Sequence, residues 1–224
     1  MAKDRVEAVD RALTLLEAFH EPGEQLTLAQ LSERTGLYKS TILRLAGSLQ
    51  HFGYLSRDPA GIFRLGASLW RLGSLYRRDF LPAELVRPVL QKLADEAGET
   101  ASFYVREGDE RVCLYRENSR QALRHHLDEG ARLPLDRGAA GRMLIAHGDD
   151  PDGVFRKVKE AGFTVSLGER DPEVGAIAVP IIDRLGVCVG VLALSGPLGR
   201  FTPQKIAQTR SLLVDAASIL GDPS

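Results

Sequence analysis

One stretch of 39 residues, positions 27–65, constrains the fold more than any other: it reads TLAQLSERTGLYKSTILRLAGSLQHFGYLSRDPAGIFRL. Thr27 and Gln30 have the T-x-x-Q spacing of a capping box, which predicts a helix that begins at Thr27. Gly36 supplies the left-handed residue that ends such a helix, and Leu37 is placed to fold back as the accompanying apolar contact. The stretch therefore starts as a short helix followed by a tight turn.

A second helix is predicted from about residue 38 to residue 52. Apolar residues at spacings of three and four give its inner stripe, namely Ile42, Leu45, Leu49 and Phe52. Its outer side keeps polar residues, most of them near its N-terminal end: Lys39, Ser40, Thr41, Arg44 and Ser48. In a helix-turn-helix this end of the recognition helix points into the major groove. Gly47 lies midway along the helix and costs about 1 kcal/mol relative to alanine, and we expect it to permit close packing.

Two short strands are predicted next, at 54–57 and 62–65, around the turn Asp58-Pro59-Ala60-Gly61. The whole pattern predicts a winged helix-turn-helix. Between positions 34 and 71 six basic residues face one acidic residue, Asp58, whereas positions 1–33 hold three basic and seven acidic residues. Positive charge thus lies on the turn, second helix and wing, where phosphate contacts would be made. We interpret the stretch as DNA-binding; the alternative is a small helical subdomain whose charges are merely solvated.

The whole chain has 224 residues and a formal net charge of −1, enough for one large or two small domains. A protein that coats nucleic acid without specificity would be basic throughout, so this balance favours a confined contact surface. The chain shows no apolar run of membrane-spanning length and no signal peptide, which predicts a cytoplasmic protein. Cys113 and Cys188 lack C-x-x-C spacing and are expected to be buried or half-buried thiols in a reducing compartment.

Flanking segments complete the N-terminal half. A first helix is predicted at about 6–19, with an apolar stripe that packs under the helix-turn-helix and has an outer rim suited to a second subunit; the stripe is Val6, Val9, Leu13, Leu16 and Phe19, with Leu15 beside it. A linker helix is predicted after Gly66, ending near 80–82. Its Trp70 is interpreted as a packing or dimer-contact residue rather than a base-stacking one.

From residue 83 the pattern changes to that of an α+β domain. A helix with Leu85, Val89, Leu90 and Leu93 inward is predicted to end at Gly98. Strands are predicted at 101–107, 111–117, about 123–127, 163–166, 174–182 and 187–195, and helices at about 139–147 and 154–161. Thr202 should cap the last helix, with Pro203 in its first turn. The predicted division is 1–66 for the DNA-binding domain, 67–81 for the linker helix and 82–224 for a second domain.

At this point the chain resembles, from end to end, bacterial transcription factors of the IclR (isocitrate lyase regulator) type. The N-terminal half carries the motifs VDRALTLLEAF, LTLAQLSERTGLYKSTILRLAGSL, GYLSRD and FRLGASLWRLG. The C-terminal half carries GETASFYVREGDERVCLY, LPLDRGAAGRMLIA, GERDPEVGAIAVPIID and GVLALSGPLGRF. The resemblance implies a winged helix-turn-helix followed by a GAF-like effector-binding domain with a mainly antiparallel sheet. It also implies a homodimer or dimer of dimers on a palindromic operator, controlled by a small organic acid.

The resemblance also implies site residues. Those expected to meet DNA are Lys39, Ser40, Thr41 and Arg44, with Arg11, Arg57 and Arg64 as phosphate contacts. Those expected to line the effector cavity are His125, Leu133, Ala139, Ala140, Ser166, Ala176, Ala193 and Ser195. Backbone N–H groups at the start of the helix at Ala139 suit an anion, although core packing is an equally good explanation for the alanines. His125 and His126 would alternate across a strand, so only one would face inward.

No metal ligand cluster and no cofactor are expected. An enzyme is disfavoured because no G-x-S-x-G elbow, P-loop or G-x-G-x-x-G stands in the right context. Between Ile145 and Phe163 the chain is much shorter than in the family, which removes part of the usual cover of the cavity. The alternative reading is therefore a DNA-binding scaffold whose C-terminal domain dimerises and binds no ligand.

Overall fold

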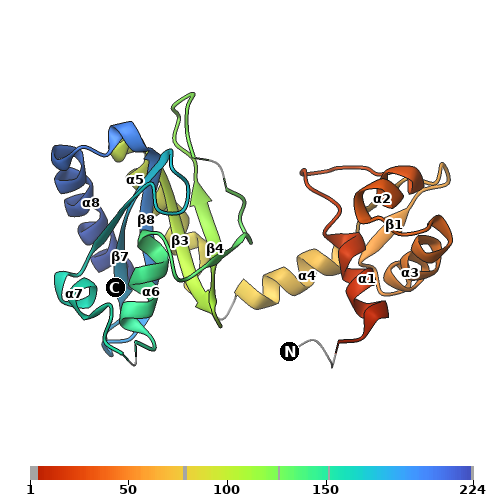
Figure 1. Ribbon diagram of the computed structural model, residues 1–224, viewed down its shortest axis with the longest axis horizontal. Coiled ribbons are helices and arrows are strands. Elements are labelled where there is room, and N and C mark those ends of the chain that lie inside the picture. The colour runs from red at the N-terminus through yellow and green to blue at the C-terminus, as the bar shows by residue number, and fades with distance from the viewer. Residues whose placement is uncertain (1–4, 78–79, 126, 151, 223–224) are drawn as a thin grey trace. The chain divides into compact units, whose positions relative to one another are not determined.

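The computed structural model describes residues 5–77, 80–125, 127–150 and 152–222. The chain divides into two compact units, Met1–Asp79 and Phe80–Ser224, which are drawn in Figure 1. Each unit has a hydrophobic core of its own. The two are described separately.

The N-terminal unit is a winged helix-turn-helix, as predicted. Its helices are α1 (Glu7–Leu16), α2 (Leu28–Thr35), α3 (Lys39–His51) and α4 (Ala67–Tyr76), and its wing is β1 (Leu55–Arg57) with β2 (Phe63–Leu65). The predicted capping box is present: Gln30 N donates to Thr27 Oγ1 (3.2 Å) and Thr27 N donates to Gln30 Oε1 (2.9 Å). Gly36 ends α2 with a left-handed φ of 68°. The two wing strands pair antiparallel, and Leu26 adds a bridge to Phe63.

The core of this unit lies between α1, α2, α3 and the wing. It contains Leu15, Leu31, Ile42 and Phe63, all fully buried. The predicted stripe on α1 is wrong at its first three positions, since Val6, Val9 and Leu13 are each more than half exposed. Leu15 and Ala18, one turn apart, face inward instead, so α1 has a second apolar face that points to solvent.

Phe52, predicted to be inside, is exposed, because it is the C-cap residue at which the chain leaves α3 before Gly53. The linker helix α4 has no buried residue, and Trp70 is 71% exposed.

The C-terminal unit is an α+β domain built on one six-stranded sheet. In chain order its elements are α5 (Ala83–Ala97), β3 (Thr100–Glu107), β4 (Glu110–Glu117), β5 (Arg132–Pro134), α6 (Ala139–His147), α7 (Arg156–Ala161), β6 (Thr164–Leu167), β7 (Val174–Ile182), β8 (Cys188–Pro197), the 3-10 turn η2 (Leu198–Arg200) and α8 (Pro203–Gly221). The strand order is β5-β4-β3-β8-β7-β6. All neighbouring pairs are antiparallel, which confirms the predicted mainly antiparallel sheet.

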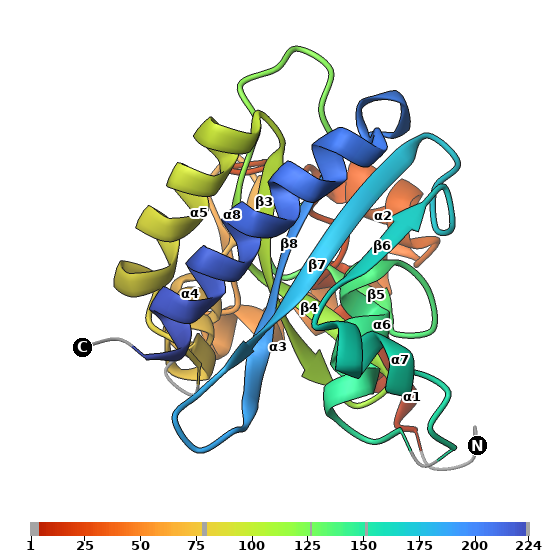
Figure 2. The same ribbon diagram turned by 90° about the vertical axis from the view of Figure 1, so that its left-hand side faces the viewer.

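Helices cover both faces of this sheet (Figures 1 and 2). On one face α5 and α8 pack over a large core that includes Phe103, Ile177, Leu192 and Leu213. On the other face α6 packs over a smaller cluster that includes Tyr104 and Met143. Successive residues of a strand point to opposite faces, so Phe103 and its neighbour Tyr104 belong to different cores.

Two predictions about this unit are wrong. Residues 123–127 form no strand in the part of them that the structure describes, and β5 pairs with β4 instead. The physical reason lies at the edge of β4, where the amide of Arg116 donates to the Glu129 carboxylate (2.9 Å) and is not available to a strand. On α5, Leu85 is exposed and Val86 is buried, because the inward row 86, 90, 93, 94 and 97 follows the helical period.

In the described part of the connection between α6 and β6, residues 148–150 and 152–163, the six-residue helix α7 is the only helix. No helix among the described residues is long and apolar enough to cross a membrane.

Candidate functional site

The candidate DNA-reading surface is the outward side of α3. Lys39, Ser40 and Arg44 are exposed on it and Thr41 is half-buried. Within the described ranges, the side chains of Lys39 and Arg44 make no hydrogen bond or ion pair. Their charges are therefore available to phosphates or to base edges in the major groove.

The three predicted phosphate contacts are exposed but already engaged within the unit. Arg11 pairs with Glu7 on α1. Arg64 donates to Gln25 Oε1 (2.9 Å) and to Asp58 Oδ2 (3.4 Å), and Arg57 stacks on the Phe63 ring, 5.0 Å from its centroid. Exposed ion pairs contribute little to the stability of the folded protein. These arginine side chains could therefore leave their present partners and bind a phosphate.

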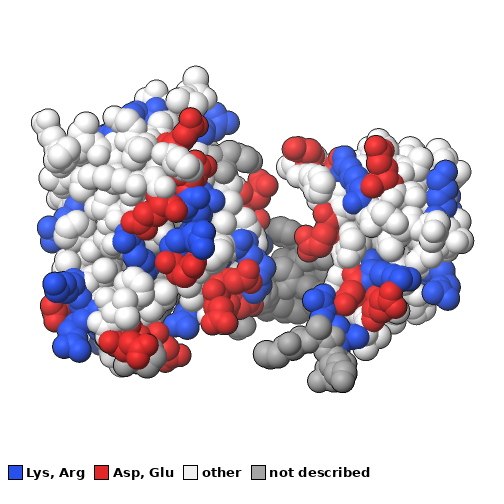
Figure 3. Space-filling view, in the orientation of Figure 1, with Lys and Arg blue, Asp and Glu red and all other residues white. Residues whose placement is uncertain are grey.

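Tyr38 and Leu43, which were not predicted as contact residues, are also exposed on this side of the unit. Tyr38 is the N-cap residue of α3 and is 84% exposed, and Leu43 is 41% exposed. Both could have been identified as apolar residues that fall outside the predicted inner stripe of the second helix, on the side that faces water. On the face of the molecule in Figure 3, basic and acidic side chains are interspersed over both units.

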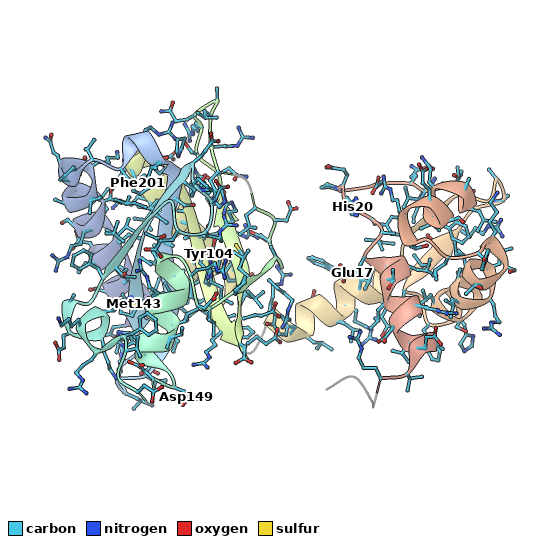
Figure 4. All side chains as sticks on the ribbon, in the orientation of Figure 1. Glu17, His20, Tyr104, Met143, Asp149 and Phe201 are labelled. Carbon is cyan, nitrogen blue, oxygen red and sulfur yellow. The ribbon has the colours of Figure 1, made fainter. Side chains whose placement is uncertain are left out.

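The eight residues predicted to line an effector cavity do line a single cavity, in the C-terminal unit. It has a volume of about 40 Å³ and lies between β3, β8, β7, β6 and the start of α6. Figure 4 labels Tyr104 on β3, which is a further wall residue, and Met143 on α6, which is buried beside it. The other lining residues that were not predicted are Arg111, Gly138, Arg170, Asp171 and Val174.

His125 connects three chain segments at this cavity. Arg170 Nη2 lies 2.7 Å from His125 Nε2, and because a guanidinium can only donate, Nε2 accepts. His125 Nδ1 lies 3.2 Å from Ser195 Oγ and 3.4 Å from Arg116 Nη2. A second guanidinium, that of Arg116, donates to the backbone oxygen of His125 and to Ser102 Oγ (3.1 Å). His126 lies outside the described residues.

Arg111 is a buried cation in the cavity wall, with 4% of its surface exposed. Its Nη1 donates to the carbonyls of Pro134 and Arg137, and its Nε has no hydrogen-bond partner. Burial lowers the pKa of the Arg111 guanidinium, and the charge of Arg170 lowers this pKa as well. A bound anion would relieve both effects.

The N-terminus of α6 forms another part of the wall. The first amides of a helix lack partners within the helix, but the Glu169 carboxylate already reaches the amide of Gly138 at 3.4 Å while it pairs with Arg142 at 2.9 Å. Gly141 is required here because a Cβ would lie 2.3 Å from the backbone oxygen of Leu135. The loop between β6 and β7 therefore contributes Glu169 to the helix start and Arg170 and Asp171 to the cavity.

A wider groove of about 610 Å³ adjoins the cavity and shares His125, Asp171 and Val174 with it. Cys113 is a buried free thiol, and burial raises its pKa to about 11. Cys188 is free and half-buried. These two environments agree with the predicted buried and half-buried thiols. Among the residues that the structure describes, no three His, Cys, Asp or Glu side chains gather as metal ligands would.

Comparison with known proteins supports both halves of this description. The IclR helix-turn-helix domain matches residues 8–59, and the C-terminal domain of bacterial IclR transcriptional regulators matches residues 81–154. The HTH-type transcriptional regulator KipR of Bacillus subtilis is 27% identical, with 96% of each chain covered. That alignment extends over 241 positions, more than the 224 residues of this chain, so the relative has residues that this chain lacks.

Two solved structures share the fold. The IclR protein of Thermotoga maritima has a TM-score of 0.77 at 19% identity, with 97% of this chain and 98% of that chain covered. An IclR homologue of Microbacterium hydrocarbonoxydans, crystallised with 4-hydroxybenzoate, has a TM-score of 0.74 at 22% identity, with 96% and 98% covered. The two matched domains together span more than half of the chain, and their order is that of the two units described above. The chain belongs to the IclR family of transcriptional regulators, whose N-terminal domain is a DNA-binding helix-turn-helix.

Proposed function

We propose that this chain is a sequence-specific transcriptional regulator whose affinity for its operator is controlled by a small organic acid. The proposal for the effector depends on one observation above all: two guanidinium groups, Arg111 and Arg170, line a cavity that has Asp171 as its only acidic wall residue within the described residues. A buried cation without a carboxylate partner is costly. An anionic ligand in the cavity would offset that cost. Such a regulator would act in the cytoplasm, where bacterial DNA lies.

On the DNA side, the proposal assigns base-edge and phosphate contacts to the outward side of α3. We expect Lys39→Ala and Arg44→Ala each to weaken operator binding, by about tenfold per lost base contact, and to leave the melting temperature unchanged because both side chains are exposed. The measurement is a gel shift against a palindromic duplex selected from a random pool with the native protein. Unchanged affinity in both variants would contradict this placement of the recognition helix.

Phosphate contacts by Arg57 and Arg64 have a separate signature. Each lost phosphate contact lowers the slope of log K against log salt concentration by about one unit. We therefore expect Arg57→Ala and Arg64→Ala to reduce this slope while the preference for the operator over random DNA stays the same. A slope equal to that of the native protein would remove the residue from the set of phosphate contacts.

The size of the cavity restricts the acid. A volume of about 40 Å³ holds about three water molecules, so only a compact acid group fits inside. A larger acid would place its acid group beside Arg111 and Arg170 and its remainder in the adjoining groove. Apolar walls such as Leu133 and Ala193 suit the carbon next to the carboxylate.

The effector proposal is tested by thermal shift with a graded panel of acids: acetate, pyruvate, benzoate and 4-hydroxybenzoate. We expect at least one acid to raise the melting temperature. Arg170→Gln should weaken that acid about ten- to a hundredfold, the value of a hydrogen bond to a charged group. Arg137→Gln is the matched control, because the Arg137 side chain is exposed and pairs with the neighbouring Asp136. Equal weakening in both variants would contradict a direct contact with Arg170.

We also infer a homodimer or a dimer of dimers. Four apolar side chains of the N-terminal unit are exposed, namely Val6 at the N-cap of α1, Val9 and Leu13 on α1, and Trp70 on α4, and contact with a second copy of the chain would remove them from water. The second candidate function is a dimeric DNA-binding scaffold without a ligand. It is favoured by the small volume of the cavity and by the short chain segment between Ile145 and Phe163. It predicts that no acid of the panel shifts the melting temperature, while DNA binding and dimer formation remain.

A further inference from the structure

His125 stands in the wall between the small cavity and the wider groove of the C-terminal unit. The two share three lining residues, His125, Asp171 and Val174. The cavity, about 40 Å³, is far smaller than an ordinary ligand site of about 300–1,000 Å³, whereas the groove, about 610 Å³, lies within that range. Arg111 and Arg170, which suit an acid, line the cavity and not the groove. A site of ordinary size that includes both guanidinium groups therefore requires an opening in this wall.

Two members of the wall are fixed by backbone hydrogen bonds. Val174 begins β7, where its carbonyl accepts from the amide of Gly168 and its Cα lies opposite Pro197 of β8. Asp171 closes the preceding turn: its carbonyl accepts from the amide of Val174 and its carboxylate from that of Glu173, each at 3.0 Å. Neither residue can leave the wall unless the turn or the strand breaks.

His125 is held in the wall mainly by its imidazole ring. It lies outside every helix and strand. Its Nε2 accepts from Arg170 Nη2 at 2.7 Å, and its Nδ1 lies 3.2 Å from Ser195 Oγ and 3.4 Å from Arg116 Nη2. Arg116 also donates to the backbone oxygen of His125. Because this last contact does not involve the ring, the imidazole can turn out of the wall while the backbone of His125 stays in place.

The imidazole occupies groups that an acid would use. Carboxylate oxygens accept hydrogen bonds from guanidinium and hydroxyl groups. Arg170 and Ser195 both line the cavity, and both are in contact with the imidazole of His125. A carboxylate that binds these two side chains must therefore displace the ring.

We propose that the side chain of His125 is a gate that sets the size of the acid that this site accepts. With the ring in the wall, only the cavity beside Arg111 is open to an acid, and its volume suits one as small as acetate. When the ring turns out, the cavity and the groove become one site. The carboxylate of a larger acid, such as benzoate, then takes the place of the ring on Arg170 and Ser195.

This inference rests on the proposed function, since it requires the cavity to bind an acid. It gives His125 the role of a competitor of the larger acids, whereas the sequence analysis expected a contact of the bound effector. The two roles predict opposite effects when the ring is removed.

The test compares the affinities for acetate and for benzoate, measured by thermal-shift titration of the full chain. The forms compared are the native protein, His125→Ala and His125→Gln. Alanine removes the gate. Glutamine is the conservative variant, because its amide oxygen can accept from Arg170 in place of Nε2. Thermal melting without ligand shows whether each variant is folded.

We expect His125→Ala to bind benzoate about ten- to a hundredfold more tightly than the native protein, because the acid no longer displaces a hydrogen bond to a charged group. Its affinity for acetate should change little, since acetate fits beside the closed gate. His125→Gln should restore most of the native preference for the smaller acid. Neutral imidazole should weaken the binding of benzoate by His125→Ala, because it can refill the place of the missing ring, and should leave the native protein unaffected.

Benzoate binding by His125→Ala that is unchanged or weaker would overturn the inference; a weaker affinity would make the ring a contact of the bound acid. An equal gain for acetate and benzoate would overturn it too, because the gain would not depend on size. Failure of the proposed function has a different signature, namely that no acid of the panel binds either the native protein or His125→Ala. If Arg170→Gln weakens an acid while His125→Ala does not strengthen benzoate, the acid site remains and only the gate is wrong.

Discussion

The ion pair between Glu99 and Arg200 gives the sharpest prediction about stability, because its two members are buried to very different extents. The Glu99 side chain is 3% exposed and the Arg200 side chain is 33% exposed. Both oxygens of Glu99 are engaged, Oε1 by Arg200 Nε at 2.6 Å and Oε2 by Arg200 Nη2 at 2.7 Å. Arg200 Nη2 also donates to the backbone oxygen of Leu123 at 3.1 Å.

Removal of Arg200 should therefore lower the free energy of unfolding by more than removal of Glu99. Arg200→Ala leaves a buried carboxylate without its cation, which costs about 3–5 kcal/mol. Glu99→Ala leaves a guanidinium that can turn toward water, so its cost should be about 1–2 kcal/mol. The double variant should resemble Glu99→Ala, because it contains no uncompensated charge.

The assay is urea unfolding of the full chain at pH 7, followed by far-ultraviolet circular dichroism and by tryptophan fluorescence. The only tryptophan of the sequence, Trp70, lies in the N-terminal unit, so its signal serves as an internal control for a loss confined to the C-terminal unit. The reasoning would be refuted if Glu99→Ala cost as much as Arg200→Ala, or if the double variant were the least stable of the three.

Three further predictions concern the N-terminal unit. The guanidinium of Arg34, with backbone amides, lowers the pKa of Glu24 from 4.5 to about 2. The ionised Glu24 therefore stabilises the folded protein fully above pH 4.5, and this stabilisation is lost as the pH falls through 2. The difference in urea midpoint between the native protein and Glu24→Gln should accordingly decrease to zero over that interval. Gly66→Ala should destabilise the protein by about 1–3 kcal/mol, measured by thermal melting, because its Cβ would lie 2.1 Å from a backbone oxygen. Leu15→Ala should lower the free energy of unfolding by about 2–5 kcal/mol. Val9→Ser, at an exposed position, should lower it by less than about 0.5 kcal/mol in the monomer. Equal losses in the two variants would show that the inward side of α1 is assigned wrongly.

Local chemistry explains which parts of the fold the sequence predicted. The capping box at Thr27, the left-handed Gly36 and the turn after Arg57 each act within a few residues, so the pattern alone specifies them. The strand expected at 123–127 failed for the opposite reason: the edge of β4 is occupied by Glu129, a side-chain contact that no local pattern contains. On α1, two apolar stripes compete, and only tertiary packing selects the one with Leu15.

At the candidate cavity, too, some residues could be predicted from the sequence and others depend on tertiary contacts. The resemblance to a family supplied positions for the small and apolar wall residues, which the structure brings together. It did not supply Arg111 and Arg170, which set the charge of the cavity. Arg111 lies on a strand that was recognised from its apolar residues alone, and Arg170 lies in a loop 45 positions from the histidine that it contacts. Contacts between such distant positions follow from the pairing of strands and have no signature in either segment.

The order of strands in the sheet also bears on how the protein emerges from the ribosome. The central pair joins β3, the first strand of its unit, to β8, the last one, with Thr100 opposite Ser195. A nascent chain must therefore be almost complete before this sheet can close, and contacts so distant along the chain form slowly. The winged helix-turn-helix is synthesised first and has a local core of its own, and domains generally fold in the order of their synthesis. During translation the DNA-binding unit would thus be folded well before the C-terminal unit is complete.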